Sequence, residues 1–344
     1  MTGARRSGLS LLAALAVSLL ILPAAARGAV RVIAGGAPSS SVVAAAAHRA
    51  ATYLRRAQNR DGGIGAAPGT RSSALFSAWA ALGLASDDVD VAALRRAPSD
   101  PTLLRYLQRH AGATDSGSLE RTILALRAGG ATVTSVAGHD LAGELTHRFS
   151  RRGAVGGLVN LTAFGVLALC AADIGSTSTL EDRALGWLAG QSNRDGGYGF
   201  AGRGSQSDAD DTGAVLEALH CAPGSSANAV VRARRGAVAY LRRDQDHDGG
   251  FPSAPGAGSN AQSTAWAIQG LIAAGVNPAT VRRDGHTPLG YLVGLVSGSG
   301  AVSYARRQSV TPVWVTGEAL LALTGTPLPF VTPTTAVPAL TTRG

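Results

Sequence analysis

The chain has 344 residues, of which 45% are hydrophobic and 15% are charged, and its formal net charge is +9. An apolar fraction of this size is ordinary for a folded protein and excludes a wholly disordered chain. The basic residues are all arginines, mostly scattered as pairs on helix faces, and no nucleic-acid-binding motif accompanies them. We therefore expect no nucleic-acid partner.

The first 26 residues have the pattern of a signal peptide. Arg5-Arg6 precedes an apolar run over residues 9–22, and an Ala-x-Ala cleavage pattern ends at Ala26. The run is too short for a stable membrane-spanning helix. We expect export by the Sec or twin-arginine route, cleavage near Ala26, a secreted or cell-envelope location and no stable membrane anchor. Residues 27–44 are interpreted as a small-residue linker.

Three stretches, 53–65, 187–199 and 240–252, are versions of one another, each with an aromatic-Leu pair eight residues before Asp-Gly-Gly. Self-similarity at a period of about 50 residues is typical of helical repeats that bury their apolar faces against neighbouring repeats. Weaker copies raise the number of repeats to six. Their anchors are Tyr53, Tyr106, Leu145, Trp187, Tyr240 and Tyr291.

Each repeat supplies a second helix with a polar residue near its start and a Leu-rich end. The segments are 77–84, 121–126, 161–169, 211–219, 263–271 and 315–323. Twelve helices in six hairpins predict an all-α fold, a closed ring of inner and outer helices over residues 45–325. The three Asp-Gly-Gly turns should be equivalent, each following an outer helix at one end of the ring. Residues 259–262 fit a capping box before one inner helix.

The tail, 326–344, is rich in Pro and Thr and is predicted to be disordered. The two cysteines, Cys170 and Cys221, end the second helices of neighbouring repeats. The sequence leaves open whether they form a disulfide or remain two buried thiols. No Cys or His lies at ligand spacing from either cysteine, so we expect no metal site and no cofactor.

One longer pattern occurs twice, from Arg49 to Gly63 and from Arg235 to Gly250. It consists of Arg-(Ala/Gly)-x-x-aromatic-Leu, followed by a Gln and then by Asp-Gly-Gly. It resembles the QW repeats of squalene-hopene cyclases, in the terpenoid cyclase and protein prenyltransferase superfamily. In this chain the closing Trp is replaced, for example by Phe251. The resemblance covers residues 45–325 and implies a single α6/α6 toroid, in a chain that we expect to be a secreted bacterial member.

The segment Asp208-Ala209-Asp210-Asp211-Thr212 resembles the DxDDTA motif of class II terpene cyclases. In that family the middle aspartate protonates a terminal alkene or epoxide. The resemblance therefore implies that Asp210 is the proton donor and that Asp208 and Asp211 tune its acidity. The alternative is structural, because carboxylates at a helix N-terminus cap free N–H groups, and Asp210 would then point to water.

The chain also departs from its relatives. Class II cyclases have two toroids with the cavity between them, whereas this chain supplies one, and only 5% of its residues are aromatic. It lacks the Asp, Cys and His zinc ligands of prenyltransferase β subunits and the thioester pentapeptide of complement-like domains. Cobalamin carriers are secreted toroids of similar size, but they have an additional β domain.

Four aromatic residues recur near the starts of the predicted inner helices. Trp79, Phe164 and Trp266 each stand two residues after a Ser or Thr, and Trp314 is placed at a similar level. They predict an aromatic girdle around a central ligand-binding cavity. The alternative is that these side chains pack between inner and outer helices.

Together these patterns predict an exported toroid that binds an apolar small molecule, such as an isoprenoid, in its centre. The enzymatic form of this hypothesis is proton-initiated cyclisation at Asp210. The alternative is a non-catalytic secreted carrier, similar to the cobalamin carriers, or a protein-interaction scaffold. A central pocket reached by Asp210 favours the enzyme and a plugged centre favours the scaffold. The sequence does not specify the ligand, a protein partner or the oligomeric state.

Overall fold

The structure, a computed structural model, describes residues 37–172, 178–221 and 227–330. Within these ranges the chain forms twelve α-helices, a 3₁₀ turn (Pro278–Thr280) and two short antiparallel strands, β1 (Phe251–Pro252) and β2 (Ser259–Asn260). The odd-numbered helices are α1 (Ser40–Arg56), α3 (Leu103–Arg109), α5 (Leu141–Arg148), α7 (Ser178–Gly190), α9 (Asn228–Asp244) and α11 (Pro288–Leu295). The even-numbered helices are α2 (Ala74–Ser86), α4 (Ser116–Ala128), α6 (Val159–Ala172), α8 (Ala209–Cys221), α10 (Ala261–Ala273) and α12 (Pro312–Thr324).

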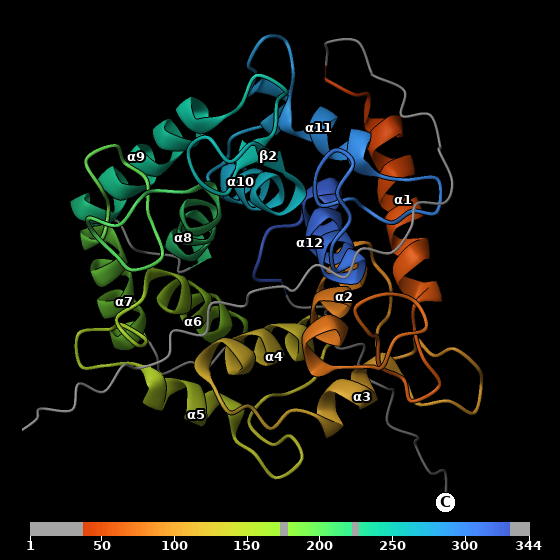
Figure 1. Cartoon of the computed structure of the whole chain (residues 1–344). Coiled ribbons are helices and arrows are strands. Elements are labelled where there is room, and N and C mark those ends of the chain that lie inside the picture. Colours follow the sequence, from red (N-terminus) through yellow and green to blue (C-terminus); the bar gives the residue numbers. More distant parts are fainter. Residues whose placement is uncertain (1–36, 173–177, 222–226, 331–344) are drawn as a thin grey trace, which may run out of the picture.

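The helices form two concentric layers (Figure 1). The even-numbered helices make the inner ring, in which each packs against the next and α12 packs against α2, so the ring closes. The odd-numbered helices cover its outside. The predicted all-α toroid of six helix hairpins is therefore confirmed.

The two layers differ in how the chain buries its apolar residues. In the outer helix α1 the buried residues recur at helical spacing, as at Ala46, Ala50 and Leu54, and the opposite face is exposed. The inner helices α6 and α10 are buried almost all round, because the outer layer covers one face and the rest of the ring covers the other. This difference follows from the position of each helix in the toroid.

The three Asp-Gly-Gly turns are equivalent, as the repeats predict. In each, the Asp side chain accepts a hydrogen bond from the N–H of the second glycine, at 2.9–3.1 Å. The first glycine has a positive φ, which favours glycine because it has no Cβ. These first glycines are Gly62, Gly196 and Gly249, with φ of 87°, 85° and 88°.

A second hydrogen bond ties the end of each turn to the inner helix that follows. The N–H of Ile64, for example, donates to the hydroxyl of Ser77 at 2.9 Å. The same bond recurs in four other repeats, at 2.9–3.0 Å. The accepting hydroxyls there belong to Thr162, Thr212, Thr264 and Thr316. These hydroxyls fix the height and rotation of the inner helices relative to one another.

Glycines bring two pairs of inner helices unusually close together. A Cβ on Gly213 of α8 would lie 2.3 Å from the carbonyl oxygen of Trp266 in α10. A Cβ on Gly317 of α12 would lie 2.5 Å from the carbonyl oxygen of Trp79 in α2. Both carbonyls belong to tryptophans at the centre of the ring, so these contacts also position the central aromatic residues.

Cys170 and Cys221 form a disulfide, with their Cα atoms 6.2 Å apart. It joins the C-terminal ends of the neighbouring inner helices α6 and α8. This settles the pairing that the sequence left open. In the described parts of the chain, no helix has the length and apolar character needed to cross a membrane.

Two sequence-based boundaries need correction. The linker assigned to 27–44 is too long, because Ser39 caps α1 and the helix begins at Ser40. The disordered tail assigned to 326–344 begins too early, because Leu328 is only 3% exposed and belongs to the central hydrophobic cluster. The proposed signal peptide and the rest of the tail lie outside the described residues.

The capping box predicted at 259–262 is also wrong. The cap of α10 is Asn260, whose side-chain oxygen accepts from the N–H of Ser263 at 2.9 Å. The hydroxyl of Ser259 instead donates to Asp248 of the preceding turn. Gln262 is therefore free to donate to Glu318 of the neighbouring inner helix α12.

Replacing Gly213 by Ala should destabilise the toroid, since the new methyl group overlaps the backbone of α10 and overpacking of this kind costs about 1–3 kcal/mol. Thermal denaturation should show a lower midpoint. The matched control is Gly186→Ala in the outer helix α7, where a Cβ meets no atom within 4 Å. That change should stabilise by up to about 1 kcal/mol, as expected for Ala in place of Gly in a helix. Equal effects at the two positions would contradict the close packing of α8 and α10.

Replacing Leu328 by Ala should lower the free energy of unfolding by about 2–5 kcal/mol, as for other large-to-small changes in a core. Val42→Ala serves as the control, because Val42 is an exposed residue of α1 and surface changes usually stay within about 0.5 kcal/mol. Chemical denaturation measures both. If Leu328→Ala is as mild as the control, the segment after α12 does not belong to the folded core.

Candidate functional site

The inner helices share one register, which decides which side chains face the centre. Each inner-helix segment of the sequence repeat ends in a Leu, and the residue seven positions before that Leu is equivalent in all six repeats. These residues are Ser77, Leu119, Thr162, Thr212, Thr264 and Thr316. In most of these helices the residues two before and two after this position line a central pocket. Asn160 and Phe164 of α6 are one such pair, and Trp314 and Glu318 of α12 are another.

The pocket has a volume of about 360 Å³ and lies at the N-terminal ends of the inner helices. All six of these helices contribute to its wall, and Tyr304, from the loop before α12, completes it. A pocket of this size is at the lower end of the range for small-molecule sites.

The four aromatic residues singled out in the sequence meet at this pocket. Phe164 and Trp266 contact each other edge to face at 5.3 Å between ring centroids. Trp79 contacts the other three at 5.9–6.3 Å and stacks with Trp314 at an interplanar angle of 12°. We call this group the aromatic floor, since Trp79, Phe164 and Trp266 stand one helical turn deeper than the polar residues Asn160, Asp210 and Gln262. Trp314 begins one turn nearer the opening and still reaches the group.

The three aspartates of the Asp208–Asp211 segment have different positions. Asp208 precedes α8, and its Oδ1 accepts the N–H of Asp211 at 2.7 Å, which is a capping bond. Asp211 is buried, and its Oδ1 accepts from the side-chain amide of Asn160 at 3.2 Å. Asp210 lines the pocket, and its Oδ1 is shielded from solvent without a hydrogen-bond partner among the described residues. The structure therefore separates two supporting aspartates from one that faces the cavity.

Burial raises the pKa of all three carboxyl groups. The pKa of Asp210 rises to about 6 because of burial, against which the hydroxyl of Ser263 favours the ionised form. The pKa of Asp208 rises to about 9, through burial and the neighbouring charge of Asp211. Asp208 thus keeps a proton, which it can donate in its side-chain hydrogen bond with Asp211, while Asp210 holds its proton mainly below about pH 6.

Two glutamates and an arginine of the pocket were not singled out in the sequence. Glu318 accepts from Gln262 at 2.6 Å and from the indole N–H of Trp314 at 2.7 Å, and burial raises its pKa to about 7. Glu120 is 1% exposed, and neither of its carboxyl oxygens has a hydrogen-bond partner within the described chain. Burial raises its pKa well above the ordinary value. Arg121, its neighbour on α4, also lines the pocket.

Glu120 could have been found from the repeat alignment. It stands one residue after Leu119, in the position that other inner helices fill with small residues. Glycine at this position makes the close contacts of α8 and α12. The sequence signal that was missed is therefore a glutamate at a repeat position that is otherwise occupied by small residues. The small residues are Ala78, Ala163, Gly213, Ala265 and Gly317.

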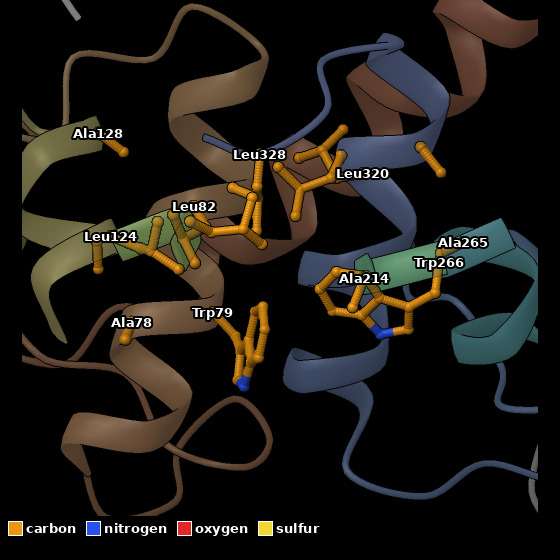
Figure 2. Packing of buried hydrophobic residues seen from close by; sticks show 14 of the residues in the cluster. Ala78, Trp79, Leu82, Leu124, Ala128, Ala214, Ala265, Trp266, Leu320 and Leu328 are labelled. Carbon is orange, nitrogen blue, oxygen red and sulfur yellow. The ribbon is translucent and has the colours of Figure 1, made fainter. Parts of the chain in front are cut away.

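The opposite end of the ring is filled. The backbone N–H of Leu328 donates to Oε1 of Glu217 at 2.8 Å, and burial raises the pKa of that carboxyl well above its usual range. In Figure 2 the side chain of Leu328 gathers with those of Leu82 and Leu320, apart from Trp79 and Trp266. The segment after α12 thus closes the ring toward the C-terminal ends of the inner helices and leaves the pocket at the other end.

The described residues contain no group of three or more His, Cys, Asp or Glu side chains arranged to hold a metal ion. The carboxyl groups of the pocket come from three different helices, α4, α8 and α12, rather than from one cluster. What the site offers chemically is proton transfer and charge next to aromatic rings.

Comparison with solved structures finds the same fold. The type II terpene cyclase MstE from Scytonema superposes with a TM-score of 0.60 at 13% identity, over 83% of this chain and 98% of that one. A variant of it in complex with geranylgeranyl dihydroxybenzoate, its substrate, gives 0.57 at 13% identity, with 83% and 97% covered. A glycosidase gives 0.55 at 14% identity, also with 83% and 97% covered. At these identities the likeness concerns the fold alone.

No curated protein matches the sequence. The family model of the prenyltransferase alpha-alpha toroid domain matches residues 12–119 and 141–293, which is most of the chain. The match spans all the helix hairpins that carry Asp-Gly-Gly turns and the whole Asp208–Asp211 segment. The chain belongs to the prenyltransferase alpha-alpha toroid family and has the fold of the terpene cyclases.

Proposed function

We propose that this toroid binds an isoprenoid-like ligand in its central pocket and that Asp210 starts a cyclisation by protonating it. The aromatic floor offers an apolar surface for a hydrocarbon chain. The polar residues above it, among them Asn160 and Gln262, offer partners for a polar end. A ligand with both an apolar and a polar part fits this division better than a pure hydrocarbon does.

The observation that carries the proposal is the position of Asp210. Asp210 lines the same pocket as the aromatic floor and keeps one shielded oxygen without a hydrogen-bond partner among the described residues, while Asp208 and Asp211 are engaged with each other and with Asn160. Transfer of the Asp210 proton to the less substituted carbon of the terminal double bond breaks the carboxyl O–H bond, forms a C–H bond and leaves a tertiary carbocation and the Asp210 carboxylate. The next double bond of the chain attacks that cation, and loss of a proton from the last cation gives a neutral cyclic product.

The aromatic floor supports the same chemistry. The face of a Trp or Phe ring attracts positive charge, and the attraction is greatest in a site that excludes water. Trp79, Phe164 and Trp266 surround the inner part of the pocket, where a cation formed beside Asp210 would move. Stabilisation of the cation rather than of the alkene is what accelerates the step.

Export is part of the proposal. The signal-peptide pattern supports it, and so does the Cys170–Cys221 disulfide, because structural disulfides persist mainly in oxidising compartments. An exported protein could still reach isoprenoids in the membrane. The ligand would then enter from the pocket's opening, since Leu328 fills the other end of the ring.

The alternative is a non-catalytic secreted carrier or an interaction scaffold. The partly polar pocket supports a carrier, and the filled end of the ring supports a scaffold in part. The fold does not choose between these, since its structural neighbours include a polysaccharide lyase as well as cyclases and a glycosidase. The pocket reached by Asp210 is the reason for preferring the enzyme.

The change Asp210→Asn should reduce cyclised product by roughly 10²–10⁴-fold, the contribution of a positioned general acid. The purified protein is incubated with squalene and with prenylated phenols and benzoates, and products are measured by gas chromatography with mass spectrometry. Asp182→Asn, at an exposed position of α7, is the control and should retain activity. Undiminished product from Asp210→Asn would contradict the proposal. A wild type that binds such substrates without forming product would support the carrier.

The pH dependence should follow the proton on Asp210. Its folded-state pKa, about 6, lies above the unfolded value, so ionisation opposes folding and stability is lost as pH rises from about 4 through 6. The rate should also fall above pH 6, as the acid loses its proton. Asp210→Asn should remove this part of the stability change, measured by thermal denaturation from pH 4 to 8. A wild type and variant with parallel stability curves would show that the carboxyl is solvated.

A further inference from the structure

We infer that the central pocket also binds a compact organic cation of the quaternary ammonium class, seated over the aromatic floor with Glu120 and Glu318 as its counter-charges. This goes beyond the proposed function. It concerns a stable ligand rather than a reaction, and it holds whether or not Asp210 transfers a proton.

The strongest observation is the set of buried oxygens that have no partner. Both carboxyl oxygens of Glu120 and one of Asp210 lie shielded at the pocket wall without a hydrogen bond from the described residues. A buried oxygen in this state raises the free energy of the empty protein, and native structures contain few of them. A cation in the pocket would offset part of this penalty by charge attraction, which requires no hydrogen-bond donor.

The charges of the pocket wall point the same way. Three carboxyl groups line it, from Glu120, Asp210 and Glu318, against one guanidinium, from Arg121. Burial raises the pKa of each of these carboxyl groups in the empty pocket, to about 6 for Asp210 and about 7 for Glu318. A bound cation would favour their ionised forms, so binding should release protons.

The aromatic floor selects the kind of cation. Four rings, from Trp79, Phe164, Trp266 and Trp314, contact one another at the pocket. Their faces attract a cation, and cages of aromatic rings are the known means of recognising quaternary ammonium groups. Such a group has no N–H, so it needs no hydrogen-bond acceptors, and its methyl groups suit an apolar surface.

The positive charge of Arg121 provides a test of whether the bound ligand is a cation. It lies beside Glu120 on α4, and its only hydrogen bond shown in the described structure goes to the hydroxyl of Ser118 at 3.3 Å. No carboxylate of the described residues forms an ion pair with it within 4 Å. Its charge would repel a bound cation, whereas the carboxylate of Glu120 would attract it.

The first experiment uses isothermal titration calorimetry with choline and with 3,3-dimethylbutan-1-ol, its neutral counterpart of the same shape. Choline should bind with one site per chain and at least about tenfold more tightly than the alcohol, because only choline gains the cation–aromatic and charge attractions. Equal affinities, or no saturable binding of choline, would overturn the inference.

The second experiment compares three variants with wild type. Glu120→Gln should weaken choline binding by about tenfold, and Arg121→Gln should strengthen it, since removal of an attractive or a repulsive charge acts in opposite directions. The control Glu217→Gln, at the filled end of the ring, should leave the affinity unchanged. If Glu120→Gln and Arg121→Gln shift the affinity in the same direction, the affinity does not depend on the charges of these two residues, which contradicts the inference.

A measurement on the unmodified protein avoids dependence on how the variants fold. Titration of choline near pH 6.5 in two buffers of different ionisation enthalpy measures the protons released on binding. We expect net release from Glu120, which also faces Asp115, Arg121 and Arg148, or from Glu318, which faces Asp210 and Arg121. Binding without proton release would contradict the inferred contact with these carboxyl groups. Neither result depends on turnover, so failure here is distinguishable from failure of the cyclase proposal.

Discussion

The hydrogen bond from the end of each turn to a hydroxyl on the next inner helix is the constraint on which the site depends. It recurs in five of the six repeats and ties five of the inner helices to their turns in the same way, while α4 has Leu119 at the equivalent position. Once the helices share a register, the residues two before and two after the hydroxyl face the centre. The pocket is thus a property of the repeat, and its chemistry comes from the few positions where the repeats differ.

Those differences are concentrated in three helices. In α8 the residue two positions before the hydroxyl is Asp210, and in α12 the residue two positions after it is Glu318. In α4, Glu120 occupies a position where the other inner helices have a small residue. All three of these residues line the pocket. Burial there raises the pKa of each group, and the aromatic floor lies beside them.

The repeat pattern predicted the ring, the equivalent turns and the meeting of four aromatic residues, because each follows from periodicity alone. The position of Asp210 could be proposed from a motif, but whether it faced the pocket or water depended on the rotation of α8. Glu120 was overlooked because it breaks the register rather than matching a motif. Leu328 was assigned to a disordered tail because local composition does not reveal that the centre of the ring needs to be filled. The disulfide likewise required the distance between α6 and α8.

The central claim is that Asp210 is a shielded acid at the ligand pocket. Nuclear magnetic resonance of protein labelled with ¹³C at the aspartate carboxyl groups tests it most directly, with the Asp210 signal assigned by its absence in Asp210→Asn. The account predicts that this signal titrates near pH 6 and shifts when a ligand occupies the pocket. A signal that titrates near the unperturbed pKa of about 4, and whose chemical shift does not change when a ligand binds, would contradict it.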